Sequence, residues 1–103
     1  MNRDVVYDVV EAIGEDISSI IYNHLSKPIR DIYGKIVNKV EDGVYDYLSK
    51  IENVDKMNFD EMYKVGFRMY IILLFEEMMK YFDSELEEFK NQIKLINSKD
   101  NGF

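Results

Sequence analysis

The sequence contains no cysteine, which excludes disulfide bonds, thiol catalysis and cysteine-ligated metals. It has a single proline, Pro28, and its longest uncharged apolar run, MYIILLF at 69–75, is only seven residues long. Because a helix that crosses a bilayer needs about 20 apolar residues, this run does not predict a membrane span.

The sequence motifs of common enzyme sites are missing as well. No glycine-rich phosphate-binding loop, nucleophile elbow or EF-hand loop occurs, and His24 is the only histidine. We therefore expect a protein that is not an enzyme and has no catalytic residue, bound cofactor or metal site.

Length and composition are those of one globular domain spanning residues 1–103. The chain is 47% hydrophobic and 32% charged, well outside the range of disordered proteins. Asp4 and Asp8 stand where a signal peptide requires an uncharged apolar core, so the expected location is the cytoplasm.

Apolar residues recur at three- and four-residue steps along most of the chain, which is the period of an α-helix. One stripe covers residues 4–25 and a second covers 29–51, with Gly43 as an alternative end of a shorter helix within the second. Ser26 and Pro28 suit the start of a new helix, as N-cap and first-turn residue. The apolar phase carries across this break, so one kinked helix is the alternative.

A third helix is expected to begin at Asn58, which forms a capping box with Glu61. From Val65 to Phe82 apolar side chains cover nearly every direction around the axis, a pattern typical of a helix packed on several sides. Beyond Ser84 the helix either continues or gives way to a fourth. The fold class expected is all-α, an antiparallel bundle of three to four helices with a central apolar helix at about 58–82. Residues 97–103 are expected to fray.

The net charge of −7 is concentrated in two zones. Residues 1–26 hold five acidic side chains against one basic, and residues 76–88 hold six against one. Such a surface repels nucleic acid and anionic lipid and attracts basic proteins. We therefore expect no direct nucleic-acid or membrane contact. A DNA-binding regulator is a further alternative, and its local basic patch would consist of Lys27, Arg30, Lys35 and Lys39.

The first acidic zone contains a row that we call the acidic ridge. Its members stand at steps of four, three and four residues along one face of the first helix: Asp4, Asp8, Glu11 and Glu15. Side chains so spaced lie about 6 Å apart, close to the spacing of phosphates along a nucleic-acid strand. The ridge is thus a candidate for binding a basic channel, and a solubilising helix face is the plainer alternative. The second candidate set for partner binding is Glu76, Glu77, Glu85 and Glu88.

Two apolar seams with nearly heptad spacing, at 29–51 and 82–96, favour helix–helix contact within one chain or between two. The candidate packing or dimer contacts are Tyr63, Gly66, Tyr70, Phe82, Leu86, Phe89 and Ile93. Sequence alone does not separate packing within the chain from a homodimer.

The stretch NFDEMYKVGFRMYIILLFEEM resembles a pattern in small helical proteins from low-GC Gram-positive bacteria and their prophages. Phe59, the Gly66–Arg68 triplet and Glu76 or Glu77 fit that pattern, whereas Met69 and Tyr70 stand where a second glycine is usual. In size and charge the chain is also similar to small acidic phage inhibitors such as anti-CRISPR proteins.

These features lead to one expected function and one alternative. The expected function is non-enzymatic: a phage or mobile-element protein that uses the acidic ridge to block a basic nucleic-acid-binding surface of a host defence enzyme, such as a nuclease complex. The alternative is a self-associating structural or regulatory homodimer.

Overall fold

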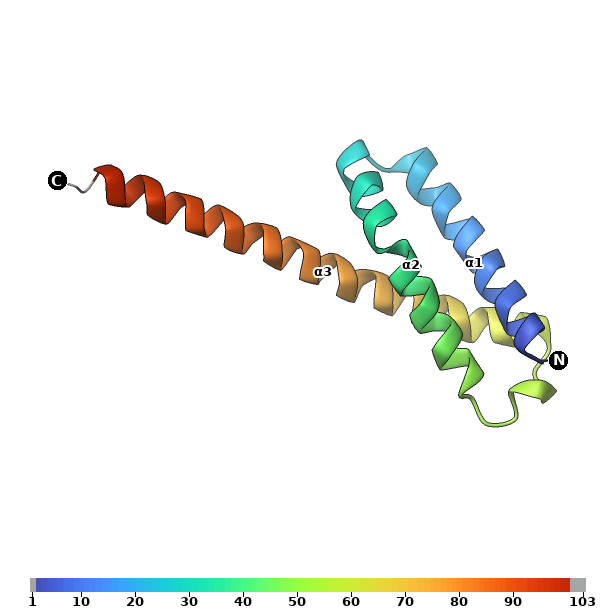
Figure 1. Cartoon of the computed structure of the whole chain (residues 1–103). Helices are drawn as coiled ribbons and strands as arrows, with labels where there is room; N and C mark the ends of the chain where they lie inside the picture. The colour runs from blue at the N-terminus through green and yellow to red at the C-terminus, as the bar shows by residue number, and fades with distance from the viewer. Residues whose placement is uncertain (1, 101–103) are drawn as a thin grey trace.

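The computed structural model describes residues 2–100, and the side chains of residues 5–96 within them. Three α-helices make up most of this part: α1 (Asn2–His24), α2 (Lys27–Ser49) and α3 (Phe59–Asp100), with a short 3₁₀ turn η1 (Val54–Lys56) before α3 (Figure 1). The described residues contain no strand. The expected all-α class is therefore confirmed.

The boundary between α1 and α2 is where the sequence predicts it. Ser26 is extended (φ −70°, ψ 159°) and precedes α2 as its N-cap, and Pro28 stands in the first turn. Proline is tolerated there because the first N–H groups of a helix have no partner within it. The structure thus has two separate helices here, and the alternative of one kinked helix is wrong. α2 continues through Gly43 without a break.

α3 begins at its predicted cap and does not divide. The Oδ1 atom of Asn58 accepts a hydrogen bond from the backbone N–H of Glu61 at 2.8 Å, half of a capping box. The helix then runs past Ser84 to Asp100, so no fourth helix begins there. The helix includes 97–100 of the expected frayed tail, whereas 101–103 lie outside the described residues.

α1 and α2 form an antiparallel hairpin, and the first half of α3 crosses both (Figure 1). We call this three-helix unit the head. Its buried core draws on all three helices: Val6, Val9, Val10, Ile13, Ile17 and Ile21 from α1; Ile32, Tyr33, Ile36, Val40, Val44 and Leu48 from α2; Met62, Tyr70 and Leu74 from α3. The seam predicted at 29–51 is therefore largely used inside the chain.

Gly66 marks the closest approach of α3 to the hairpin. A Cβ atom at this position would lie 2.8 Å from Ile13 Cδ1 and 3.1 Å from Leu48 Cδ1, both in fully buried side chains. The absence of a side chain thus lets three helices meet at one point. Gly66 packs within one chain and offers no surface to a partner.

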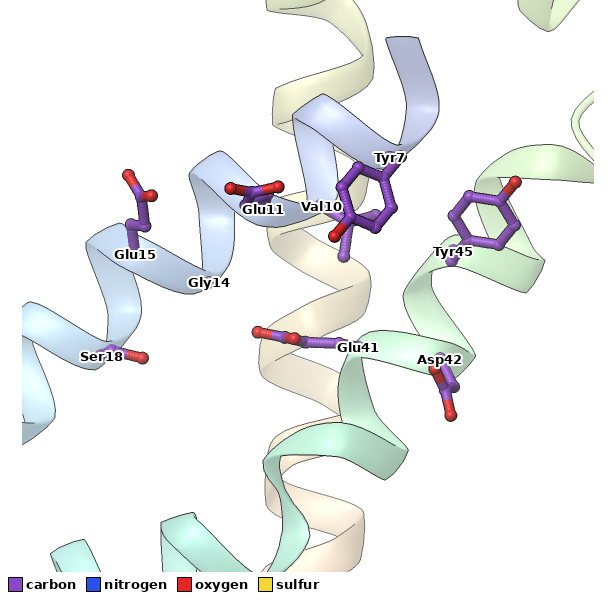
Figure 2. Close-up of a pocket in the computed structure, with 9 residues that line it drawn as sticks. All are labelled: Tyr7, Val10, Glu11, Gly14, Glu15, Ser18, Glu41, Asp42 and Tyr45. Carbon is purple, nitrogen blue, oxygen red and sulfur yellow. The ribbon is translucent and has the colours of Figure 1, made fainter. Parts of the chain in front are cut away.

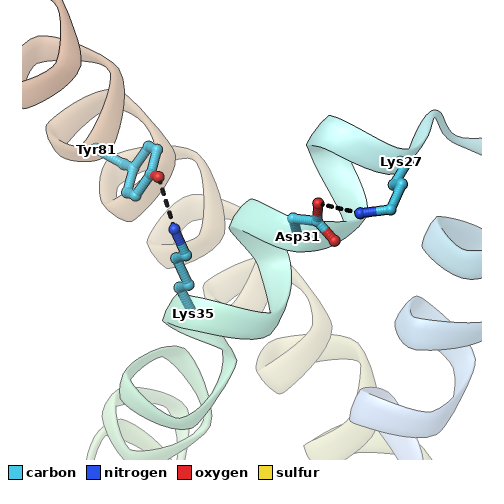
Figure 3. A network of polar contacts seen from close by, with 4 residues as sticks. All are labelled: Lys27, Asp31, Lys35 and Tyr81. Atoms are coloured by element: carbon cyan, nitrogen blue, oxygen red, sulfur yellow. Dashed lines mark hydrogen bonds and ion pairs between the residues drawn. The ribbon is translucent and has the colours of Figure 1, made fainter.

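The second half of α3 extends away from the head (Figure 1). The radius of gyration is 19.0 Å and the extents are 69 × 30 × 16 Å, whereas a compact chain of this length has a radius of about 13 Å. Lys35 of α2 donates a 3.0 Å hydrogen bond to the hydroxyl of Tyr81, next to the Lys27–Asp31 ion pair (Figure 3). Every side chain from 82 to 96 is exposed.

The expectation that α3 is packed on several sides along its apolar stretch is not confirmed. Ile72, Phe75 and Met79 are exposed, although they lie within or beside the part that crosses the hairpin. Two shorter helices cover one face of α3 and leave another apolar face in water. None of the described helices is long and apolar enough to span a bilayer.

The crossing at Gly66 leads to a stability prediction. In Gly66→Ala a gain of about 1 kcal/mol in helix propensity is outweighed by an overpacking cost of roughly 1–3 kcal/mol, so the free energy of unfolding falls by about 1 kcal/mol. Gly34 is the matched control, since a Cβ there meets only the Tyr22 hydroxyl at 3.7 Å. Gly34→Ala is expected to stabilise by about 0.5–1 kcal/mol. Urea denaturation measures both, and equal stabilisation by the two variants would contradict the crossing.

Candidate functional site

A chain of hydrogen-bonded side chains links the three helices inside the head. The Ser18 hydroxyl lies 2.9 Å from that of Tyr33, which lies 2.7 Å from that of Tyr70. The Tyr70 hydroxyl donates in turn toward Glu41 Oε2 at 3.4 Å. If each hydroxyl donates to the next, the chain runs from Ser18 to the carboxylate without leaving a buried polar group unpaired.

Glu41 ends this chain at the head surface, beside Gly14 of α1. A Cβ atom at Gly14 would overlap the carboxylate of Glu41, so the glycine makes room for it. Burial raises the pKa of Glu41 above its ordinary value of 4.5; the Tyr70 hydrogen bond opposes this rise, and the Asp42 and Glu11 carboxylates add to it. Burial and the bond to Tyr33 also raise the pKa of Tyr70 well above 10.0.

An open groove of about 330 Å³ lies between α1 and α2 at this point (Figure 2). Glu41 extends across it from α2 toward α1 (Figure 2). We call it the acidic groove, because four carboxylates and two tyrosines are among its lining residues: Tyr7, Val10, Glu11, Gly14, Glu15, Ser18, Glu41, Asp42 and Tyr45. The described lining contains no basic side chain, so the groove can accept lysine or arginine from outside.

The acidic ridge is partly joined to this groove. Glu11 and Glu15 line it, Asp8 is exposed on the same helix, and the side chain of Asp4 lies outside the described part of the chain. The neighbouring Asp16 accepts a hydrogen bond from the hydroxyl of Tyr63, which raises the pKa of Tyr63 to about 12. Tyr63 is thus engaged within the head.

The second acidic set is not one surface. Glu77 forms ion pairs with Lys39 and Lys80, each at 3.1 Å, and only 12% of its side chain is exposed. Its hydrogen bond to Lys39, followed by that to Lys80, lowers its pKa. Glu77 therefore ties α3 to α2, whereas Glu76, Glu85 and Glu88 are exposed along α3.

An exposed apolar stripe runs along α3, and we call it the α3 seam. Its members follow one another at alternating steps of three and four residues: Ile72, Phe75, Met79, Phe82, Leu86, Phe89, Ile93 and Ile96. Their exposed fractions lie between 40% and 63%. This is the a/d pattern of a coiled coil, without a partner helix over it.

The predicted contact residues thus divide into two groups. Gly66 and Tyr70 are buried in the head, and Tyr63 is half-buried against it. The others belong to the α3 seam and are exposed: Phe82, Leu86, Phe89 and Ile93. The second group is the more accessible to another molecule.

An apolar groove of about 270 Å³ adjoins the α3 seam where the hairpin tip diverges from α3. It is lined by Ile17, Ile20, Ile21, Leu25, Ile29, Tyr33, Phe67, Ile71, Leu74, Phe75 and Met78. Phe75 belongs to both features, so the groove and the seam form one continuous apolar surface.

Sequence reasoning missed two parts of these surfaces. Glu41 and Asp42 line the acidic groove because α1 and α2 approach each other at Gly14. No local sequence pattern predicts this approach. The extension of the seam to Ile72, Phe75 and Met79 was visible in the spacing, which continues the steps of 82–96 without a break. The all-round apolar pattern of 65–82 favours a central helix for these residues, and the structure leaves them exposed.

The acidic groove and the α3 seam offer two means of binding. Among the described residues, no group of three or more histidine, aspartate or glutamate side chains is placed to hold a metal ion. Comparison with protein-family models, curated proteins and solved structures finds no significant match.

The raised pKa of Glu41 predicts a dependence of stability on pH. Because the folded state holds this proton more tightly than the unfolded chain, the contribution of the group is fully present below pH 4.5 and is lost as pH rises through the folded pKa. Glu41→Gln is therefore expected to stabilise the protein at pH 7 by a few tenths of a kcal/mol, a small amount because water screens the carboxylate.

Urea denaturation at pH 7 and at pH 4 measures this difference, which should shrink at the lower pH. Glu87→Gln, on the exposed half of α3, serves as the control for loss of one negative charge. A Glu41→Gln variant that is less stable than wild type at pH 7 would contradict a desolvated carboxylate.

Proposed function

We propose that this protein is a non-enzymatic binding protein that works as a homodimer, in which the α3 seams of two copies pack together. The observation that carries the proposal is the exposure of all eight seam residues at coiled-coil spacing. A second copy would supply the neighbours that α3 lacks beyond the head.

The energetics of the exposed half of α3 support the same conclusion. Short isolated helices are marginal in water, because most helical stability in proteins comes from packing of an apolar face. Residues 82–96 have no such packing within the chain. Large exposed apolar patches, of more than roughly a few hundred Å², mark interaction sites on soluble proteins.

Size measurements test the homodimer. Wild type is expected to sediment as a dimer that dissociates on dilution, and Leu86→Lys to sediment as a monomer. An unpaired charge buried in the seam costs roughly 3–5 kcal/mol, so the dissociation constant rises more than about a hundredfold. Far-ultraviolet circular dichroism of the variant should also show loss of helix, since its exposed half no longer packs.

Asn91→Lys is the matched control, because residue 91 is exposed and lies two residues after Phe89 and two before Ile93, away from the seam. This variant should remain a dimer. Wild type that is monomeric over a hundredfold range of concentration would refute the homodimer, and with it the proposal.

A second function is favoured by the acidic groove. Glu11, Glu15, Glu41 and Asp42 gather around one opening between α1 and α2, and Tyr7 and Tyr45 flank it. This arrangement supports binding of a lysine- or arginine-rich surface, such as the nucleic-acid-binding face of a host defence enzyme that a phage or mobile-element protein would block. The homodimer would then present two such grooves to its target.

Charge reversal tests the acidic groove. The triple variant Asp8→Lys, Glu11→Lys, Glu15→Lys is expected to bind a fluorescent arginine-rich peptide at least about tenfold more weakly than wild type, because opposite charges become like charges. The affinity of wild type should fall as salt is added. Fluorescence anisotropy measures both, and circular dichroism checks that helicity is kept.

A control triple variant, Glu52→Lys, Asp55→Lys, Glu87→Lys, makes the same change in net charge at exposed positions elsewhere. It should retain most of the affinity. Equal weakening by the two triple variants would assign the binding to net charge alone and remove the groove as its cause.

A further inference from the structure

We infer that the two copies in the homodimer run antiparallel along the α3 seam, with Leu86 of one copy facing Phe89 of the second. This inference rests on the proposed homodimer and specifies its orientation and register. The order of side-chain sizes along the seam and the charges beside it both favour this arrangement.

Side-chain size favours the antiparallel arrangement. Within 79–96, a parallel pair has each seam residue facing its own copy, so Phe82 and Phe89 would form two all-phenylalanine layers. In the antiparallel register Met79 faces Ile96, Phe82 faces Ile93 and Leu86 faces Phe89. Each phenylalanine in these layers then opposes an aliphatic side chain, and the layers become similar in volume, as close packing requires.

The charges along α3 favour the same orientation. Residues 76–88 hold six acidic side chains and one basic, whereas 89–96 hold two lysines and no acid. A parallel pair places the two acidic stretches side by side. An antiparallel pair places each acidic stretch beside the basic end of the other helix, where opposite charges attract.

One ion pair follows from this register. Asp83 and Lys90 stand at the positions that immediately follow seam residues Phe82 and Phe89, so both flank the seam on one side. In an antiparallel coiled coil like flanks meet. Asp83 of each copy therefore lies opposite Lys90 of the other, which gives two ion pairs related by the twofold axis.

The head leaves the seam free for this partner. The side chains of α3 that contact the hairpin include Leu74, Met78 and Tyr81, each one residue before a seam residue and so rotated about 100° from it around the axis. Packing of 79–96 covers about 27 Å of helix at a rise of about 1.5 Å per residue. It brings Ile96 of the second copy against Met79, beside the mouth of the apolar groove.

A charge swap tests the register. Asp83→Lys is expected to weaken dimerisation roughly tenfold, since two attractive pairs become two repulsive ones. The double variant Asp83→Lys, Lys90→Asp should recover wild-type affinity, because the pairs form again with the charges exchanged. Glu87→Lys makes the same charge change off the seam and should leave the dissociation constant within about twofold. Analytical ultracentrifugation at low salt measures all four proteins.

Cross-linking distinguishes the two orientations directly, because the chain has no native cysteine. A mixture of Asp83→Cys and Lys90→Cys chains should form a disulfide between the two variants in the antiparallel pair. A mixture of Glu85→Cys and Lys90→Cys chains should do so only in a parallel pair, where these flanking positions meet.

The outcomes of these experiments distinguish the antiparallel register from the homodimer itself. Cross-linking of the 83/90 mixture together with recovery in the charge swap supports the antiparallel register. Cross-linking of the 85/90 mixture, or no recovery in a protein that still dimerises, overturns the register and leaves the homodimer standing. A wild type that is monomeric removes both.

Discussion

A helix of 42 residues cannot be covered by two helices of 23 residues each, and this mismatch in length governs the structure. At a rise of about 1.5 Å per residue α3 extends over about 63 Å, whereas the hairpin extends over about 35 Å. The hairpin therefore contacts only the first half of α3, and it covers one face of that half. The elongated shape and the exposure of α3 beyond Tyr81 follow from that shortfall, whereas Ile72, Phe75 and Met79 are exposed because the hairpin covers one face only.

Within the covered half, polar and apolar contacts share the task of holding three helices in one arrangement. The crossing at Gly66 is apolar and requires that the side chains of three helices fit together. The chain from Ser18 through Tyr33 and Tyr70 to Glu41 requires hydrogen bonds of correct distance and direction. If one helix slid along another, the side-chain hydrogen bonds of this polar chain would break inside the core, where unpaired polar groups are costly. The polar chain thus gives the head a defined register that apolar packing alone would not require.

The parts of the fold that depend on local chemistry were predictable from the sequence. Ser26 and Pro28 define one helix boundary and Asn58 another through interactions within a few residues. The environment of each apolar stripe was not predictable. The seams at 29–51 and 82–96 have nearly the same spacing, yet the first is largely buried in the head and the second faces water. Periodicity shows which residues share a face, and only the fold shows what covers it. The same holds for Glu41 in the candidate site, whose position depends on a contact between helices.

The unbroken course of α3 through Ser84 also restricts how its length can change. Because one rigid helix carries both the stripe that contacts the hairpin and the seam, a single-residue insertion between Tyr81 and Leu86 would rotate one against the other by about 100°. An insertion of seven residues would rotate them by only about 20° and lengthen the helix by about 10 Å. Insertions and deletions in this segment should therefore be tolerated in units of seven residues, because such changes keep the seam on nearly the same side of α3 relative to the hairpin.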